Sequence, residues 1–243
     1  MNISKIFFTV LALVVLYIII ELLVFWYRTE HRATLPTIDQ SDKTIGSGPI
    51  LKFIAVGDSV TVGAGASDLE HTYAYKVALE LSKTNTVQYR NIAIIGDKTQ
   101  DVIDKQLQNI ITYKPDVVVI SMGGNDDTHF VSSNKVLNNF KFVINELEQK
   151  TTAKIYLSTI PNFYTGSLLP WFYIELMEAR SAKLIPKLFQ LEDARTKIVN
   201  IHDYGIYAHP KNKGYSAPDN FHPNNIGYEN WSNAFIEKIN RTK

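Results

Sequence analysis

The chain has 243 residues, of which 45% are hydrophobic and 20% are charged, so it is long enough for one well-packed domain with a short appendage. Its formal net charge is only +1 and no long run of like charges occurs, which argues against a nucleic-acid partner. Cysteine is absent, which excludes disulfides, thiolate metal sites and a cysteine nucleophile.

An apolar segment near the amino terminus, residues 6–27, is interrupted only by Thr9 and Glu21. About 20 such residues span the hydrocarbon core of a bilayer. A cleaved signal peptide would have a shorter apolar run followed by a small-x-small site, whereas this run ends in aromatic residues and Arg28. We therefore predict an uncleaved transmembrane anchor over residues 1–28.

The orientation of this anchor is only weakly encoded, because Lys5 precedes the apolar run and Arg28 and Arg32 follow it. Long domains translocate largely regardless of such flanking charge. We expect a single-pass protein of the cell membrane whose main domain lies outside the cytoplasm. Residues 29–49 are polar and contain two prolines and two glycines, which predicts a linker to a folded domain over residues 50–243.

From Leu51 onward, short β-branched apolar runs alternate with longer segments of helical period, as in βαβ units around a parallel sheet. Two of the helical segments, residues 102–111 and 136–147, carry an apolar stripe, and a last helix is expected over Asn224–Lys238. The predicted fold is a three-layer α/β/α sandwich. Its five expected strands are Lys52–Val56, Gln88–Ile95, Asp116–Ser121, Lys154–Thr159 and Lys197–Ile201.

Ser59 follows the first predicted strand directly, within Gly57-Asp58-Ser59, and therefore lies at a strand-to-helix turn. A serine at such a turn is close to backbone donors, as a nucleophile requires. Serine is also a preferred helix N-cap, and this triplet is a common turn composition. Taken alone, the motif favours neither interpretation.

Gly96 and Asn125 follow the second and third predicted strands, at the sheet edge where open parallel sheets bind ligands. A glycine leaves its N–H accessible to a ligand, and an asparagine side chain offers an amide donor. Both fit an oxyanion hole, although turn chemistry selects the same residue types. Their coincidence with Ser59 favours the functional interpretation.

Asp219 and His222 lie three residues apart in a loop before the last predicted helix. An aspartate at this spacing can fold back and accept the imidazole Nδ1–H, which leaves Nε2 free to take a proton from a serine. A surface histidine beside a helix-capping asparagine would explain this segment on its own. The four segments together favour serine hydrolase chemistry.

These segments resemble the four sequence blocks of the SGNH hydrolases, the GDSL-type lipase and esterase family. Their order and spacing match as well, and the resemblance covers about residues 50–240. Val60 stands where the family name has leucine, and we expect its side chain to point away from the reacting atoms. The matching residues are Gly57-Asp58-Ser59, Gly96, Gly124-x-Asp126 with Asn125 between, and Asp219-x-x-His222.

The resemblance implies a flavodoxin-like sheet order and ester hydrolysis through a covalent acyl-enzyme, with no metal and no organic cofactor. It implies Ser59 as the nucleophile, His222 as the general base and Asp219 as the partner of that base. The backbone N–H groups of Ser59 and Gly96 and the side chain of Asn125 would form the oxyanion hole.

Residues 161–195 form the longest stretch between predicted strands. We expect an ordinary crossover helix whose aromatic side chains mostly pack on the sheet, rather than a substrate-facing cap. Phe163 and Tyr164, directly after the fourth strand, are the candidates for the cleft. A histidine close to the Asn125 loop, His129, is expected to make a structural hydrogen bond.

The function predicted from these features is hydrolysis of a carboxylic ester at the cell envelope. The ester belongs to an O-acetylated carbohydrate or to a lipid or lysophospholipid, and the sequence does not choose between them. Two alternatives stay open: a non-catalytic anchored binding module on the same fold, and an acyltransferase that uses the same triad.

Overall fold

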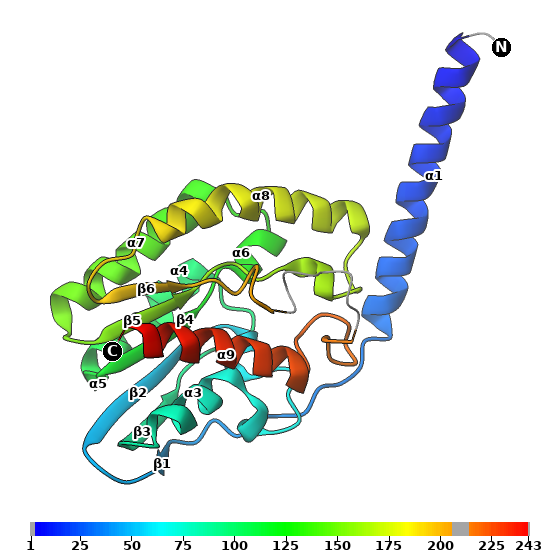
Figure 1. Ribbon diagram of the computed structural model, residues 1–243. Helices are drawn as coiled ribbons and strands as arrows, with labels where there is room; N and C mark the ends of the chain where they lie inside the picture. Colours follow the sequence, from blue (N-terminus) through cyan, green and yellow to red (C-terminus); the bar gives the residue numbers. More distant parts are fainter. Residues whose placement is uncertain (1–2, 206–213, 243) are drawn as a thin grey trace.

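The computed structural model describes residues 3–205 and 214–242, and its centre is one six-stranded sheet with helices on both faces (Figure 1). The expected three-layer α/β/α architecture is confirmed. The strands are β1 (Lys43–Ile45), β2 (Ile50–Gly57), β3 (Thr86–Asn91), β4 (Val117–Ser121), β5 (Lys154–Ser158) and β6 (Thr196–Val199).

The sheet order is β1-β3-β2-β4-β5-β6, and all neighbouring pairs are parallel except β1 with β3. The five parallel strands alone have the flavodoxin-like order, with the first parallel strand between the second and third. The prediction of a five-stranded sheet missed one strand, the edge strand β1, which lies inside the segment expected to be a linker. A strand of three residues is too short to show an alternating pattern.

The second parallel strand ends four residues earlier than expected. β3 stops at Asn91, whose side-chain amide donates to the carbonyl of Thr61 at 2.7 Å and accepts from the Ala93 N–H at 3.1 Å. The Ile92 and Ile94 N–H groups still donate to the Ala55 and Gly57 carbonyls of β2, but the strand has ended, and the apolar side chains of Ile94 and Ile95 are exposed. The β-branched run alone therefore overestimated the strand.

Helices cover both faces of the sheet, with α3 and α9 on one side and α5, α7 and α8 on the other (Figure 1). The connection after β5 is mainly the long helix α8, as expected for a crossover. The helices are α1 (Ile3–Glu30), α2 (Ser59–Val62), α3 (Tyr73–Leu81), α4 (Thr99–Asp101), α5 (Leu107–Tyr113), α6 (Gly124–Thr128), α7 (Ser133–Lys150), α8 (Trp171–Phe189) and α9 (Asn225–Arg241), with short turns η1 (Leu69–His71) and η3 (Phe163–Thr165) and a π-helical turn η2 (Val102–Gln106).

The core has two parts because successive side chains of a strand point to opposite faces. Phe53 and Ala55 pack toward α3 and α9, where the ring of Tyr73 stacks on Phe235 with centroids 5.0 Å apart. The alternate residue Ile54 packs on the opposite face toward α7. A strand buried on both faces needs a continuous apolar run, which is why the sequence of β2 reads as one.

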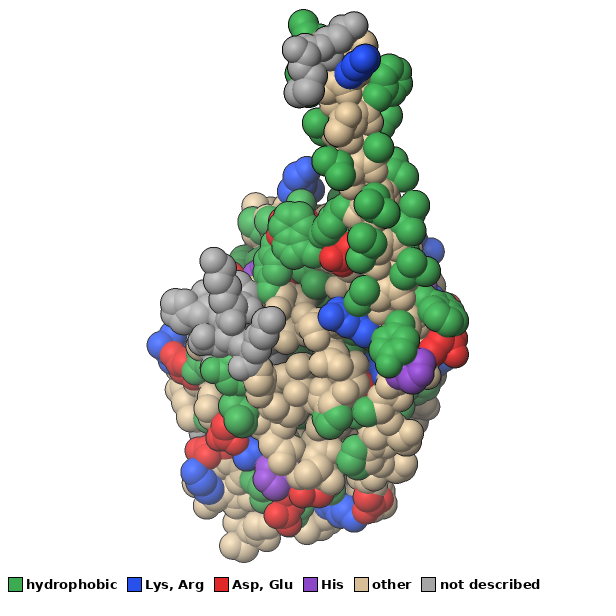
Figure 2. Space-filling model, turned by 90° about the vertical axis from the view of Figure 1, so that its right-hand side faces the viewer, with side chains coloured by type: hydrophobic (Ala, Val, Ile, Leu, Met, Phe, Trp, Pro, Cys, Tyr) green, Lys and Arg blue, Asp and Glu red, His purple; other side chains and the backbone are tan. Residues whose placement is uncertain are grey.

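Within the described residues, α1 is the one helix long and apolar enough to cross a membrane, and none of its side chains is buried. It projects away from the domain (Figure 1), and Figure 2 shows hydrophobic side chains around it and beside its base on the domain. The base is held by polar contacts. Arg28 donates to the carbonyl of Ser167, and the Trp171 N–H donates to the Glu21 carboxylate at 3.3 Å.

The segment after α1 also packs on the domain. Ile38 is 5% exposed and belongs to the core cluster on the α3 side, and the Gln40 amide donates to the carbonyl of Val62 at 2.9 Å. Residues expected to form a free linker therefore contribute to the core and, through β1, to the sheet.

Candidate active site

The turn that carries Ser59 depends on the glycine before it. Gly57 has a φ of +141°, and a Cβ there would lie 1.8 Å from the carbonyl oxygen of Ser121, so a larger residue cannot occupy the position. The Asp58 carboxylate accepts the Val60 N–H at 3.0 Å and caps α2. Ser59 is the first residue of that helix and is 6% exposed.

The side chain of Gln106, in the π-helical turn η2, fixes the end of β2. Its Oε1 accepts the Gly57 N–H at 3.0 Å, and its Nε2 donates to the Gly57 carbonyl at 2.8 Å and to the Asp97 carboxylate at 2.9 Å. Such π-turns inside helices occur frequently at functional sites. The apolar stripe of residues 102–111 hid this buried glutamine from sequence reasoning.

Ser59, His222 and Asp219 lie together although the loop that holds the last two is far along the chain. His222 Nε2 is 2.9 Å from Ser59 Oγ, and His222 Nδ1 is 2.6 Å from Asp219 Oδ2. The other carboxylate oxygen, Asp219 Oδ1, accepts the backbone N–H groups of Phe221 and His222 at 3.0 Å each. All three side chains are nearly buried, so the carboxylate is held in one orientation against the imidazole.

A fourth side chain, Arg32 from the segment after α1, completes this cluster. Its Nη2 donates to Asp219 Oδ2 at 2.7 Å and lies 3.3 Å from His222 Nδ1, while its guanidinium is 5.5 Å from the centre of the Phe221 ring. Burial raises the pKa of Asp219, but the hydrogen bonds from His222 and Arg32 outweigh it and hold that pKa well below its ordinary value. Asp219 is therefore ionised at neutral pH.

The structure treats the two other predicted donors, Asn125 and Gly96, differently. The Asn125 amide donates to the carbonyl of Asp97 at 3.1 Å and lies 3.5 Å from the Asp58 carboxylate. Asn125 lines the same pocket as Ser59, whereas Gly96 is exposed next to Asp97 and is not part of the pocket wall. Gly96 has a φ of +82°, and a Cβ there would meet nothing within 4 Å, so the backbone turn alone favours glycine.

Carboxyl groups gather behind the nucleophile turn. Burial is the main cause that raises the pKa of Asp58 to about 7; the nearby Asp126 and Asp97 carboxylates add to it, and the hydrogen bond from the Val60 N–H opposes it. Burial likewise raises the pKa of Asp126, which accepts the backbone N–H and the hydroxyl of Thr99 at 2.8 Å each. This side of the site therefore holds a proton near neutral pH.

The pocket in front of Ser59 has a largely apolar wall. Residues of the β5–α8 connection and of the His222 loop form most of it, including Phe163, Leu168, Leu169 and Phe221. Val60, whose side chain we expected to point away from the reacting atoms, is also among the lining residues. Polar residues line the rest of this space, and they are Asp58, Ser59, Ser121, Asn125, Asn162, Thr165, Asn220 and His222.

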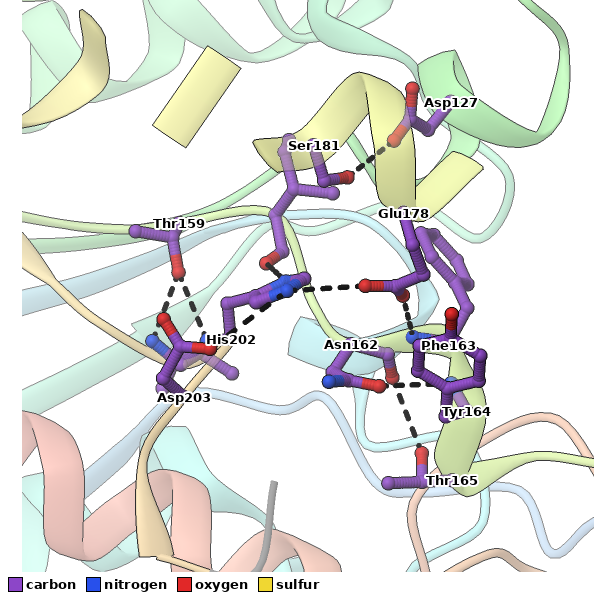
Figure 3. Close-up of polar contacts among 12 residues, drawn as sticks. Asp127, Thr159, Asn162, Phe163, Tyr164, Thr165, Glu178, Ser181, His202 and Asp203 are labelled. Carbon is purple, nitrogen blue, oxygen red and sulfur yellow. Dashed lines mark hydrogen bonds and ion pairs between the residues drawn. The ribbon is translucent and has the colours of Figure 1, made fainter. Parts of the chain in front are cut away.

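The wall that carries Phe163 is supported by a buried polar network (Figure 3). The Phe163 N–H donates to Glu178 Oε1 at 2.7 Å, and Glu178 Oε2 lies 3.1 Å from His202 Nε2. Burial lowers the pKa of His202, but the Glu178 carboxylate raises it above its ordinary value overall. Of the two cleft candidates, Phe163 lines the pocket, and Tyr164 instead donates its hydroxyl to Glu175 at 2.8 Å.

His129 makes structural hydrogen bonds, as expected for a loop histidine. Its Nδ1 is 2.7 Å from the carbonyl oxygen of Asn125, and the side chain is exposed at the end of α6. It does not line the pocket.

Similar sequences are found among known proteins. Residues 55–229 match the model of the GDSL-like Lipase/Acylhydrolase family. A curated relative, the spore germination lipase LipC of Bacillus licheniformis, is 28% identical over 210 residues, which cover 78% of this chain and 94% of that protein.

Solved structures share the fold. A lipase from a goat rumen metagenome, Lip_vut3, has a TM-score of 0.61 at 24% identity and covers 79% of this chain and 97% of its own. The acetylxylan esterase Axe2 of Geobacillus stearothermophilus has a TM-score of 0.57 at 19% identity, with 81% and 96% covered. The family match extends over most of the domain, so the chain belongs to the GDSL-like lipase/acylhydrolase family and is a carboxylic ester hydrolase.

Proposed function

We propose that the chain hydrolyses acyl esters through an acyl-enzyme on Ser59, with His222 as general base and Asp219 orienting the imidazole. The observation that carries this proposal is a pair of hydrogen-bond contacts in series. Ser59 Oγ is 2.9 Å from His222 Nε2, and His222 Nδ1 is 2.6 Å from Asp219. A non-catalytic binding module on this fold would not need a buried carboxylate, imidazole and hydroxyl aligned in this way.

In the first half of the reaction, His222 Nε2 takes the hydroxyl proton of Ser59 as Oγ attacks the ester carbonyl carbon, and the carbonyl electrons move onto oxygen. Collapse of this tetrahedral oxyanion breaks the bond to the alcohol, which leaves with the proton from His222. Water then attacks the acyl-enzyme, gives its proton to His222, and the second collapse releases the acid and returns the proton to Ser59.

The oxyanion donors in this proposal are the side chain of Asn125 and the backbone N–H of Ser59. The family resemblance adds the backbone N–H of Gly96, although Gly96 lies outside the pocket wall in this structure. Asn125 has two N–H bonds, and the one that donates to the Asp97 carbonyl fixes the plane of the amide. The second makes only a long contact of 3.5 Å with the Asp58 carboxylate, and in this proposal it turns to the oxyanion in front of Ser59. Removing one donor of this kind costs about 10²–10³ in kcat.

For the substrate, we propose a lipid ester, because the wall formed by Phe163, Leu168, Leu169 and Phe221 is suited to an acyl chain. LipC is named a spore germination lipase, which agrees with this assignment. The second candidate is an O-acetylated carbohydrate, since Axe2 is named an acetylxylan esterase and an acetyl group also fits beside Ser59. In both cases we propose that α1 anchors the enzyme in the cell membrane, with the domain outside the cytoplasm.

The test is hydrolysis of p-nitrophenyl esters, from acetate to dodecanoate, by the full chain in detergent micelles. We expect turnover that falls about 10³-fold or more in Ser59→Ala. Ser47→Ala, the same change at an exposed position, is the matched control and keeps full activity. A preference for the longer chains supports the lipid ester, and a preference for acetate supports the carbohydrate ester. A folded wild-type protein without turnover on the whole series would refute the proposed hydrolysis of esters and favour a binding module.

A further inference from the structure

We infer that Arg32 is a positioning residue of the active site: the segment that follows α1 supplies a guanidinium that orients Asp219 and sets the charge balance of the Asp219–His222 pair. This inference rests on the proposed catalytic roles of these two residues. Arg32 lies outside residues 55–229, the part of the chain that matches the family model. It belongs to the segment between α1 and the matched part of the domain.

The first argument is the hydrogen-bond pattern of the buried carboxylate. Asp219 Oδ2 accepts from both His222 Nδ1 and Arg32 Nη2, while Oδ1 is occupied by two backbone N–H groups. The side chain of Asp219 is 0% exposed and that of Arg32 is 36% exposed. A carboxylate that is withdrawn from water needs hydrogen-bond donors. Among the donors to Asp219, Arg32 is the permanent cation.

The second argument is that the segment containing Arg32 is held on both loops of the pocket. Arg28, one helical turn earlier, donates to the carbonyl of Ser167. Ser167 in turn donates its N–H to the carbonyl of Asn220 at 2.9 Å, next to Asp219. The guanidinium of Arg32 also packs on the ring of Phe221, a pocket wall. The arginine therefore lies on a braced surface and is not a free side chain that meets Asp219 by chance.

The third argument concerns the proton on His222. A positive guanidinium close to the imidazole disfavours the imidazolium, and it also shares the negative charge of Asp219 that would otherwise stabilise that imidazolium. Arg32→Gln removes both effects, so the acidic limb of the pH–rate profile reports on this role of the arginine.

Two charged or titratable side chains lie close to the pair. Arg32 from the segment after α1 contacts Asp219, and Asp58 lines the pocket beside Ser59. Asp58 is unchanged in every variant below, so its own titration cancels in the comparison.

The experiment measures kcat/KM against pH for p-nitrophenyl ester hydrolysis by the full chain in micelles. We expect Arg32→Gln to move the acidic midpoint of the profile upward by about half a pH unit or more, after allowance for the partial exposure of the arginine. Arg32→Lys keeps the charge and keeps the midpoint near that of the wild type. Arg241→Gln, the same loss of charge at an exposed position outside the pocket wall, leaves the midpoint unchanged. An Arg32→Gln profile that superimposes on the wild type, or an equal shift in Arg241→Gln, overturns the inference.

A second measurement separates this inference from the proposed catalytic function. Arg32→Gln, Asp219→Asn and the double variant are compared by their thermal unfolding temperatures, which do not depend on turnover. Direct contact predicts that the double variant loses less than the sum of the two single losses. If the wild type hydrolyses no ester, the proposed function fails while this coupling still supports the contact. Additive losses overturn the role of Arg32 even in an active enzyme.

Discussion

The buried carboxyl group of Asp58 offers a quantitative test of the electrostatics behind the nucleophile turn. Its pKa rises from an ordinary 3.8 to about 7, mainly because of burial, so the folded protein keeps this proton at a pH where the unfolded chain has lost it. The contribution of Asp58 to folding stability therefore falls as the pH rises from about 4 to about 7, and its full loss is present above the folded pKa. Asp58→Asn removes the titration and should abolish this loss.

The size of the effect follows from the shift of about three pKa units, at about 1.4 kcal/mol each, or about 4 kcal/mol above pH 7. Between about pH 4.5 and about pH 8, the free energy of unfolding of Asp58→Asn should rise by roughly 3 kcal/mol relative to that of the wild type. For a domain of this size, that gain corresponds to about 6–12 °C in the thermal midpoint. Any constant effect of the asparagine cancels, because only the change with pH is compared.

The assay is thermal unfolding followed by intrinsic fluorescence, for the wild type and Asp58→Asn at both pH values in the same detergent. Asp104→Asn makes the same chemical change at an exposed position and serves as the matched control. It should show the pH dependence of the wild type. If the difference between Asp58→Asn and the wild type is the same at both pH values, the buried carboxyl does not titrate as described and the reasoning is refuted.

Two further predictions concern the segments before the family domain. Ile38→Ala should lower the free energy of unfolding by about 2–4 kcal/mol, since Ile38 is buried against the α3 side of the core. Urea titration measures this loss, and a value below about 0.5 kcal/mol would show that the segment does not contribute to the core. The proposed topology predicts that an impermeant protease added to intact cells cuts the domain, and a domain that is degraded only after lysis would place it in the cytoplasm.

The parallel core of the fold could be predicted from the sequence because its signal is local. β2, β4 and β5 are short β-branched runs buried on both faces, and their residues alone reveal them. The strands at one edge of the sheet cannot be recognised from local sequence in this way. β1 is defined only by its pairing with β3, and β3 ends where the Asn91 side chain turns to the Thr61 carbonyl.

The candidate site divides in the same way. Ser59, Asp219 and His222 could be predicted because their motifs combine a residue type with a turn, and the structure brings all three together. Arg32 could not, because its partner Asp219 is 187 residues away and its own segment has the composition of a linker. Gln106 was hidden for a similar reason, as a polar residue inside an apolar helical stripe.

The edge strand β1 determines where this protein can be shortened. Its three residues occupy the hydrogen-bonding groups on one side of β3, from Lys43 opposite Tyr89 to Ile45 opposite Val87. A soluble form that begins at residue 45 would uncover that side of β3 and offer it to other copies of the chain as a template for strand pairing. Self-association of such a form would then reflect the cut itself, and soluble versions of the enzyme should keep the chain from Arg28 onward.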